Sequence, residues 1–373
     1  MKNIFSLSLN YKQRVYGLDV FRSIAILLVV ITHGSAILQN TILENFPWIR
    51  LIDGVDLFFV LSGFLIGSLL LKTLNTSEKF KFNEILTFWK RRWLRTLPLY
   101  YLFLLINWLL VNYTVIDGDI KQYNVSFIFF LHNFSSPFYG FFWESWSLSI
   151  EEWFYIFLPL ILFFLLLLLS AKRAFFICCA ILVITPLAYR IYLSPTVVDG
   201  FWWDVTFRKM VVTRLDAIGY GIFAAWIKYY YGPLWSKYRI IAFATGLLLL
   251  IIAVNTHPEP NSFYAKTFGL TIISLGAMLL VPAFESVKTF STQFGKVITH
   301  ISVISYAMYL INLAPISMVI MKQFTPKGGA DSLIKYIIYW FLVIVLSTLL
   351  HKFFEKPITD LRERSFRKNN IRS

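Results

Sequence analysis

The first apolar stretch of the chain, GLDVFRSIAILLVVITHG over residues 17–34, holds an arginine and a histidine with ten residues between them. In a helix, Arg22 and His33 would stand about 16 Å apart along the axis and on the same face. A histidine can accept a proton near neutral pH, and an arginine keeps a fixed positive charge. Because ionisable residues are costly within a membrane-spanning helix and mark functional sites there, the pair indicates acid–base chemistry. Alternatively, Arg22 reaches toward the lipid headgroups from the helix end, and His33 caps the helix at the opposite interface.

Five further charged residues lie in or beside apolar stretches, at ends that would share the depth of His33. They are Asp56, Glu151, Glu152, Arg214 and Asp216. Aspartate and glutamate side chains are too short to reach far toward water, so carboxylates at this depth are hard to explain as anchors. The clustering predicts a polar cavity in the outer half of the membrane. Anchoring of helix ends at the interface is the alternative.

A cationic segment, KRRWLRTLPLYY over residues 90–101, leads into another apolar stretch. Arg92 and Arg95 are three residues apart and therefore share a helix face. Arginine side chains match phosphate oxygens well, so together with Arg91 they could bind a phosphorylated ligand on the cytoplasmic side. The alternative is ordinary anchoring by positive charges beside a membrane helix.

The composition of the 373-residue chain is that of a polytopic membrane protein. Hydrophobic residues make up 58% of the chain, and charged residues only 15%, against about 25% in soluble domains. The net charge of +15 reports membrane topology and anionic lipid rather than nucleic acid. Five histidines and the adjacent pair Cys178 and Cys179 favour neither a metal cluster nor a disulfide framework.

Hydropathy predicts ten spans of about 20 residues each. They cover residues 18–39, 54–73, 93–112, 146–169, 173–193, 210–231, 239–256, 266–284, 300–323 and 333–353. The run at 125–134 is too short to cross and is expected to be re-entrant or interfacial. Most lysines and arginines fall on one side, which the positive-inside rule makes cytoplasmic. We therefore expect an all-α membrane protein: a single domain over residues 1–373, a bundle of about ten transmembrane helices, both termini cytoplasmic, and a basic tail from about residue 354 to 373.

The charged residues belong to motifs that follow one another in a set order. The stretches are GLDVFRSIAILLVVITHG with Arg22 and His33, GVDLFFVLSGFLI with Asp56, RRWLRTLPLYY with Arg92 and Arg95, WSLSIEEWFYIFLP with Trp146 and Glu151, RLDAIGYG with Arg214 and Asp216, ISYAMYLIN with Asn312, and FEKPITDLRER with Glu355. Together they resemble acyltransferase family 3, the integral-membrane acyltransferases that modify surface polysaccharides. The resemblance covers nearly the whole chain. One position departs from the pattern, because Asn312 stands where family members often carry a histidine.

The resemblance implies transfer of an acyl group, acetyl by family habit, from cytoplasmic acyl-CoA to a hydroxyl of a surface polysaccharide or another glycan. Acyl-CoA would be a cosubstrate, with no bound cofactor and no metal. A hydroxyl becomes a strong nucleophile when a base takes its proton. We expect His33 to be that base, oriented by Glu151 or Asp56. Arg22 or Arg214 would face the negative charge that forms on the thioester oxygen.

The phosphates of CoA would be held by Arg91, Arg92 and Arg95. Further residues expected to line the site are Arg214, Asp216, Trp146 and Asn312. The chain has no Gly-x-Ser-x-Gly elbow, which favours direct transfer over an acyl-enzyme. Because the donor would bind inside and His33 lies toward the outside, the pantetheine arm would have to thread a pore through the bundle.

The resemblance also implies a location and a set of partners. We expect a multi-pass protein of the bacterial inner (plasma) membrane, of the stand-alone type without an appended soluble hydrolase-like domain. Its partners would be acyl-CoA, a glycan or lipid-linked polysaccharide acceptor and the lipid bilayer. The alternatives are a polysaccharide or small-molecule transporter or flippase, an unrelated membrane acyltransferase that uses a histidine such as His351, and a non-catalytic component of polysaccharide export.

Overall fold

The computed structural model describes residues 14–44, 53–76, 82–256, 258–289 and 292–361. Within these ranges every regular element is a helix, which confirms the all-α class. The long helices are α1 (Tyr16–Gly34), α2 (Gly54–Thr76), α3 (Phe82–Asn112), α4 (Ser145–Leu166), α5 (Ala171–Leu193), α7 (Val211–Tyr230), α9 (Arg239–Asn255), α11 (Phe268–Ser286), α12 (Gln293–Ile311) and α14 (Gly329–Leu350). Shorter helices are α6 (Gly200–Trp203), α8 (Gly232–Lys237), α10 (Phe263–Lys266) and α13 (Val319–Gln323), and π-helices cover Asp204–Arg208, Asn312–Met318 and His351–Glu355.

Eight helices of the described ranges are long and apolar enough to cross a membrane, and a ninth is counted if one bent pair forms a single span. The bent pair joins Gly200–Arg208 to Val211–Tyr230 at an angle of 58°. All ten predicted spans coincide with helices, but the one predicted at 239–256 is α9, which has only 17 residues. At 1.5 Å per residue it is about 25 Å long, shorter than the roughly 30 Å of a bilayer core. Within the described residues, eight or nine of the ten predicted spans thus have the length and apolarity to cross a membrane.

Helix α3 begins at Phe82, eleven residues before the start predicted for its span. Its 31 residues correspond to about 46 Å, more than a bilayer core requires. The additional turns carry Arg91 and Arg92 and are continuous with the turn that carries Arg95, which confirms that Arg92 and Arg95 lie on one helix. The run at 125–134 does not cross, in agreement with the prediction, and contains only a short 3₁₀ turn at Val125–Phe127.

Glycines allow the central helices to approach each other closely. A Cβ atom at Gly63 of α2 would lie 2.1 Å from the carbonyl oxygen of Ile218, and one at Gly221 of α7 would lie 2.0 Å from that of Val60. Such contacts at small residues provide van der Waals packing within a membrane, where lipid removes the hydrophobic driving force between helices. These contacts fix α2 against α7.

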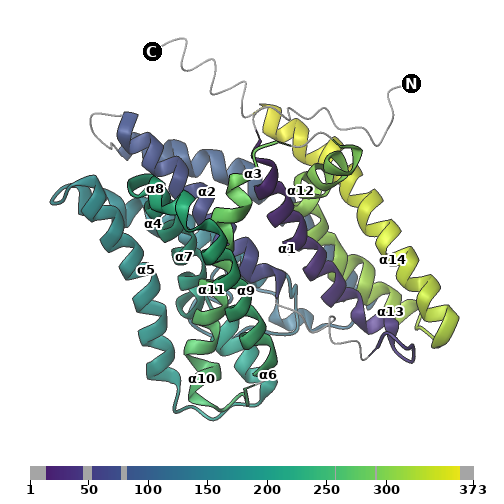
Figure 1. Ribbon diagram of the computed structural model, residues 1–373. Coiled ribbons are helices and arrows are strands. Elements are labelled where there is room, and N and C mark those ends of the chain that lie inside the picture. The colour runs from purple at the N-terminus through teal and green to yellow at the C-terminus, as the bar shows by residue number, and fades with distance from the viewer. Residues whose placement is uncertain (1–13, 45–52, 77–81, 257, 290–291, 362–373) are drawn as a thin grey trace.

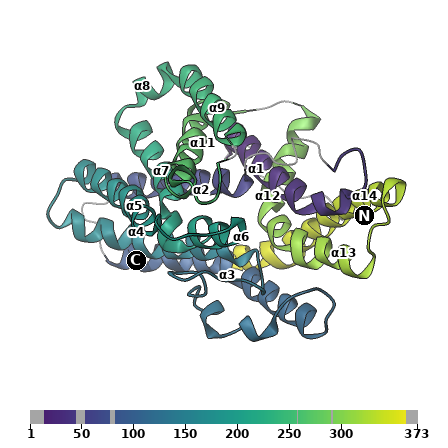
Figure 2. The ribbon, with the colours of Figure 1, turned by 90° about the horizontal axis from the view of Figure 1, so that it is seen from below.

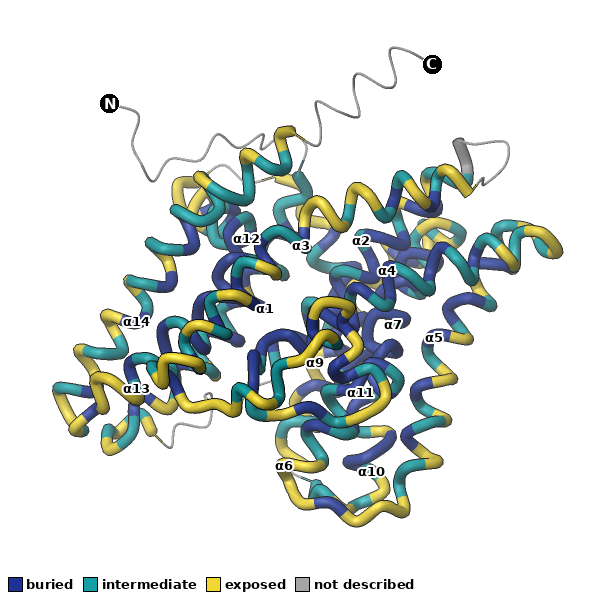
Figure 3. The backbone as a smooth tube through the Cα atoms, turned by 180° about the vertical axis from the view of Figure 1, so that it is seen from behind, coloured by how far each residue is buried: buried dark blue, intermediate teal, exposed yellow. Residues whose placement is uncertain are grey.

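The helices α1, α12 and α14 lie side by side, and α5, α7, α9 and α11 lie on the other side of the molecule (Figures 1 and 2). Helix α1 begins and α14 ends at the same side of the bundle, the upper side in Figure 1. Exposed residues run along the outer surface of α14 (Figure 3), and many of them are large and apolar, as in Ile334, Ile337 and Phe341. A lipid environment accounts for such a surface without cost.

Candidate active site

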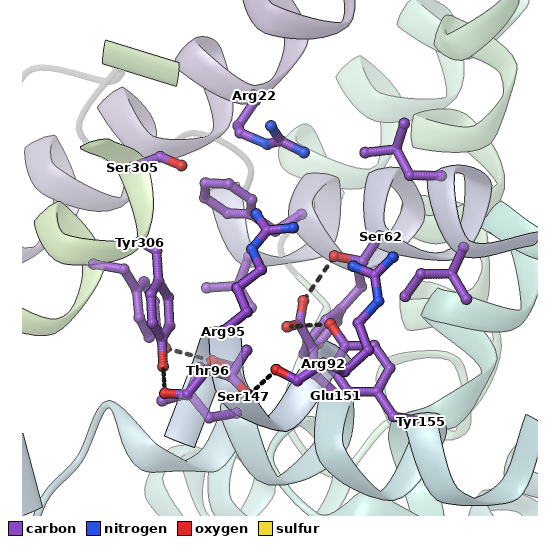
Figure 4. Close-up of a pocket in the computed structure, with 17 residues that line it drawn as sticks. Arg22, Ser62, Arg92, Arg95, Thr96, Ser147, Glu151, Tyr155, Ser305 and Tyr306 are labelled. Atoms are coloured by element: carbon purple, nitrogen blue, oxygen red, sulfur yellow. Dashed lines mark hydrogen bonds between the residues drawn. The ribbon is translucent and has the colours of Figure 1, made fainter. Parts of the chain in front are cut away.

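A pocket between α1, α2, α3, α4 and α12 contains three arginines, and we call it the arginine pocket (Figure 4). Its volume is about 110 Å³. Arg22 comes from α1, and Arg92 and Arg95 from α3, and their guanidinium groups extend into the same space (Figure 4). Three cations against one carboxylate, that of Glu151, leave an excess of positive charge in the cavity. The pocket is therefore suited to a negatively charged ligand.

Glu151 is the carboxylate that lines the arginine pocket. Its Oε1 accepts a hydrogen bond from Ser62 Oγ at 2.8 Å, and its Oε2 accepts one from Tyr155 Oη at 3.1 Å (Figure 4). These two hydroxyl groups fix the carboxylate on α4 against α2. The neighbouring Glu152 points elsewhere and accepts a hydrogen bond from Thr96 Oγ1 at 2.6 Å.

A larger cavity, which we call the entrance pocket, adjoins the arginine pocket and has a volume of about 600 Å³. The two share five lining residues, namely Arg22, Arg92, Arg95, Ser305 and Tyr306. The entrance pocket adds Arg14 and Arg91, and it reaches Thr359 beyond α14. It thus lies at the end of the bundle where α1 begins and α14 ends, and five arginines line it.

A third cavity of about 580 Å³ contains His33, and we call it the histidine pocket. Charged side chains also line it, namely Asp53, Glu144, Arg208 and Lys209. Arg208 pairs with Asp53 and Asp204. Arg208 also lies 5.0 Å above the ring of Trp146, which lines this pocket as well. Charged side chains and the rings of Trp143 and Trp146 thus line this cavity. Of the residues from which the sequence predicts a polar cavity, only His33 lies in it, and Asp56, Glu151, Glu152, Arg214 and Asp216 do not.

Val55 and Tyr309 line both the arginine pocket and the histidine pocket, and so form the wall between them. Tyr309 Oη accepts a hydrogen bond from Ser147 Oγ at 2.7 Å and donates one to the carbonyl oxygen of Glu144 at 3.0 Å. The three pockets consequently form a row through the bundle. Arg22 lines the first two pockets and His33 lines the third, so the two residues of α1 face the same row from different depths.

The hydrogen-bond partner of His33 differs from the one expected. Its Nδ1 lies 2.6 Å from Oδ1 of Asn312, whereas Glu151 lies in the arginine pocket and Asp56 is paired with Arg214. The expectation that Glu151 or Asp56 orients His33 is therefore wrong. The physical reason is that the π-helix Asn312–Met318 packs against the end of α1, where Ser317 Oγ also donates a hydrogen bond to the carbonyl oxygen of His33.

Arg214 and Asp216 do not line any of the three pockets. They form a buried ion network with Asp56 and Arg190: Arg214 pairs with Asp56 and lies 3.3 Å from Asp216, and Arg190 lies 2.8 Å from Asp216. All four residues are buried. Their charges are satisfied by one another, so Arg214 is not placed to face a thioester oxygen. The network ties α2, α5 and α7 together.

Several residues of the site escaped the sequence analysis, among them Glu144, Arg208, Lys209 and Tyr309. Glu144 and Arg208 lie just before helices that cross, where charged residues are common at the membrane interface. Tyr309 looks like an ordinary apolar position of α12. The sequence signal that could have revealed Glu144 is its place two residues before Trp146, with which the motif WSLSIEEWFYIFLP begins.

Glu144 is buried, and one of its carboxylate oxygens, Oε2, has no hydrogen-bond partner among the described residues. Its Oε1 accepts the backbone N–H of Ala314 at 2.8 Å. Burial raises the pKa of Glu144 from 4.5 to about 7, although this hydrogen bond acts in the opposite direction. A carboxyl group with this pKa is largely protonated below neutral pH and can donate or accept a proton within the histidine pocket.

We expect the Glu144→Gln variant to remove a pH-dependent loss of stability. The unfolded chain ionises near pH 4.5 and the folded one near pH 7, so the stabilising effect of the raised pKa is complete below pH 4.5 and is lost as pH rises through 7. The difference corresponds to about 3 kcal/mol at pH 8. Thermal unfolding in detergent should show that the midpoint of the variant, relative to that of the wild type, is higher at pH 8 than at pH 5. If the midpoints of the two proteins changed by the same amount between pH 5 and pH 8, the raised pKa of Glu144 would be contradicted.

Comparison with known proteins gives a consistent result. The model of the family described as acyltransferase domain matches residues 15–352. The protein named "Putative O-acetyltransferase SACOL0978", from Staphylococcus aureus (strain COL), is 29% identical over 97% of this chain and 59% of its own length. The O-acetyltransferase OatA of Staphylococcus aureus (strain NCTC 8325 / PS 47) is 27% identical over 94% of this chain and 58% of its own length.

The chain thus spans about 59% of the length of the curated relatives it matches. No solved structure matches the chain.

Proposed function

The chain belongs to the acyltransferase family, as its motifs predicted, and we propose that it moves an acyl group from acyl-CoA to a hydroxyl of a glycan. The row of three pockets that links the arginines to His33 is the single observation that carries this proposal. The O-acetyltransferase names of its relatives support an acetyl group. We place the protein in the bacterial plasma membrane, with the entrance pocket on the cytoplasmic side, where acyl-CoA is made.

The donor would bind through its phosphates in the entrance pocket. Coenzyme A carries several phosphate groups, and five arginines line this cavity. Arginine binds phosphate oxygens through two parallel hydrogen bonds, which are stronger than neutral hydrogen bonds. The pantetheine arm would then pass Arg22 and Arg95 in the arginine pocket and bring the thioester to the wall at Tyr309. This direction agrees with the shared lining of neighbouring pockets.

The acceptor would bind in the histidine pocket. Arg208, Asp53 and Glu144 offer donors and acceptors for hydroxyl groups beside the aromatic side chains of Trp143 and Trp146, and this combination suits a sugar. His33 would take the proton of the attacking hydroxyl as its oxygen bonds to the carbonyl carbon. The C–S bond then breaks, the sulfur leaves as a thiolate, and the proton on His33 is returned to it, which gives an ester and free CoA.

The donor half of the proposal is tested by the binding of acetyl-CoA to purified protein in detergent, measured by isothermal titration calorimetry. Arg92→Ala and Arg95→Ala each remove a charged hydrogen bond, which is worth about 1.5–3 kcal/mol. We therefore expect the dissociation constant to rise by about ten- to a hundredfold in each variant.

The matched control is Lys90→Ala, which removes a cation of the same helix that lines none of the three pockets. It should bind acetyl-CoA as the wild type does. An equal loss of affinity in all three variants would indicate only a general effect of positive charge, and unchanged affinity in Arg92→Ala and Arg95→Ala would contradict the donor site.

A further inference from the structure

Asn312 stands where α12 passes into the π-helix Asn312–Met318, and its side-chain amide is held in one orientation. The Nδ2 atom donates hydrogen bonds to the backbone carbonyl oxygens of Met308 and Tyr309, both at 2.8 Å. Carbonyl oxygens only accept hydrogen bonds, so the nitrogen of the amide, not its oxygen, must face them. The Oδ1 atom is therefore the one that faces His33.

The contact between Asn312 and His33 has a chemical consequence for the imidazole ring. Oδ1 lies 2.6 Å from Nδ1 of His33. Because an amide oxygen has no proton to give, Nδ1 must carry the proton of this hydrogen bond. In the neutral ring the other nitrogen, Nε2, is then unprotonated and has its lone pair available.

Two further contacts hold the π-helix in place, one to the end of α1 and one to Glu144 at the start of α4. Ser317 Oγ donates to the backbone carbonyl oxygen of His33 at 2.7 Å, and the N–H of Ala314 donates to Glu144 Oε1 at 2.8 Å. Pro315, which lacks an N–H group, interrupts the regular pattern of helix hydrogen bonds in this segment. Contacts on either side of Pro315 thus fix the distance between Asn312 and His33.

We infer that Asn312 is a positioning residue that holds His33 in the tautomer protonated at Nδ1, so that Nε2 is the atom that takes the proton of the acceptor hydroxyl. The inference rests on the proposed function, because it names the atom of the proposed base. The same role explains the position of Asn312. Its amide cannot itself transfer a proton, yet it lies buried beside His33, the only histidine among the described residues that line the histidine pocket.

The tautomer can be observed without measuring activity. Protein labelled with ¹⁵N-histidine gives nitrogen resonances that separate protonated from unprotonated ring atoms, and the His33 signals are those missing from a His33→Gln sample. In the wild type at neutral pH we expect Nδ1 to be protonated and Nε2 to be unprotonated. Asn312→Leu has a side chain of similar size but no acceptor, so this preference should be lost.

Kinetics provide the second measurement. Asn312→Leu should lower kcat by about tenfold or more, as part of the roughly 10²–10⁴-fold that a positioned base contributes, while KM for acetyl-CoA stays as in the wild type. Asn312→Asp, which keeps an oxygen acceptor, should restore the Nδ1-protonated tautomer and part of kcat. A merely structural role for Asn312 would alter KM and stability but would leave the tautomer signals unchanged.

The outcomes separate the inference from the proposed function. A wild-type His33 protonated at Nε2, or an unaltered tautomer in Asn312→Leu, would overturn the inference. Protonation of Nδ1 that depends on Asn312 would support the assigned tautomer. If the His33→Gln variant nevertheless still transferred acyl groups, His33 would be refuted as the base.

Discussion

Replacement of His33 by glutamine is expected to lower the rate of acyl transfer by about 10²–10⁴-fold, because it removes the base that takes the proton of the acceptor hydroxyl. Glutamine is similar in length and keeps a donor for Asn312 Oδ1, so the packing of α1 against the π-helix should persist. The measurement is transfer of radiolabelled acetyl groups from acetyl-CoA to glycan in isolated membranes that contain equal amounts of protein.

The matched control for this prediction is His300→Gln. His300 lies on α12, contacts Thr348 Oγ1 at 3.0 Å, and lines none of the three pockets. It should retain the wild-type rate. A similar decrease in both variants would indicate a loss of folded protein rather than of a base, and an undiminished rate in His33→Gln would remove His33 from the mechanism.

The Arg214→Met variant is expected to lose about 3–5 kcal/mol of stability, since it leaves Asp56 without its buried cation. Both members of this ion pair are buried, and the network they belong to joins α2 to α7. Thermal unfolding of the purified protein in detergent should therefore show a large decrease in midpoint. The double variant Arg214→Met with Asp56→Leu should recover part of the loss, because it removes the uncompensated charge as well.

A partly exposed ion pair provides the comparison for Arg214. Lys335 Nζ lies 2.6 Å from Asp331 Oδ2 at the start of α14, and their side chains are 20% and 38% exposed. Exposed pairs of this kind contribute about 0–1 kcal/mol, so Lys335→Met should change the midpoint little. Equal effects of the two substitutions would mean that the buried network does not stabilise the bundle.

The fold could be predicted from the sequence because a membrane imposes a simple rule on it. Each helix must satisfy its own backbone hydrogen bonds and present about 20 apolar residues, and hydropathy detects such stretches directly. The exceptions were α9, which has 17 residues, and α3, which extends well beyond the apolar stretch. In α3 the additional turns contain the charged residues Glu84, Lys90, Arg91 and Arg92, which lower the mean hydropathy of any window that includes them.

The partners of the charged residues could not be predicted in the same way. Hydropathy predicts that His33, Asp56 and Glu151 lie at similar depths in the membrane. It does not predict which helices pack against one another. Asp56 is paired with Arg214 because α2 packs against α7, and His33 faces Asn312 because α1 packs along α12. Such contacts depend on helix packing, which is set by small residues and shape rather than by charge.

The central claim, that the protein transfers acyl groups through this row of pockets, is tested most directly by measuring the acyl groups attached to a surface glycan. Wild type, His33→Gln, Arg95→Ala and His300→Gln would be produced at matched membrane levels in a host that lacks the gene, and proton NMR of the purified surface polysaccharide would quantify ester-linked acyl groups. We expect ester signals with the wild type and His300→Gln, and their loss with His33→Gln and Arg95→Ala. Equal ester signals in all four samples, or loss of the polysaccharide itself, would contradict an acyltransferase that uses this row of pockets.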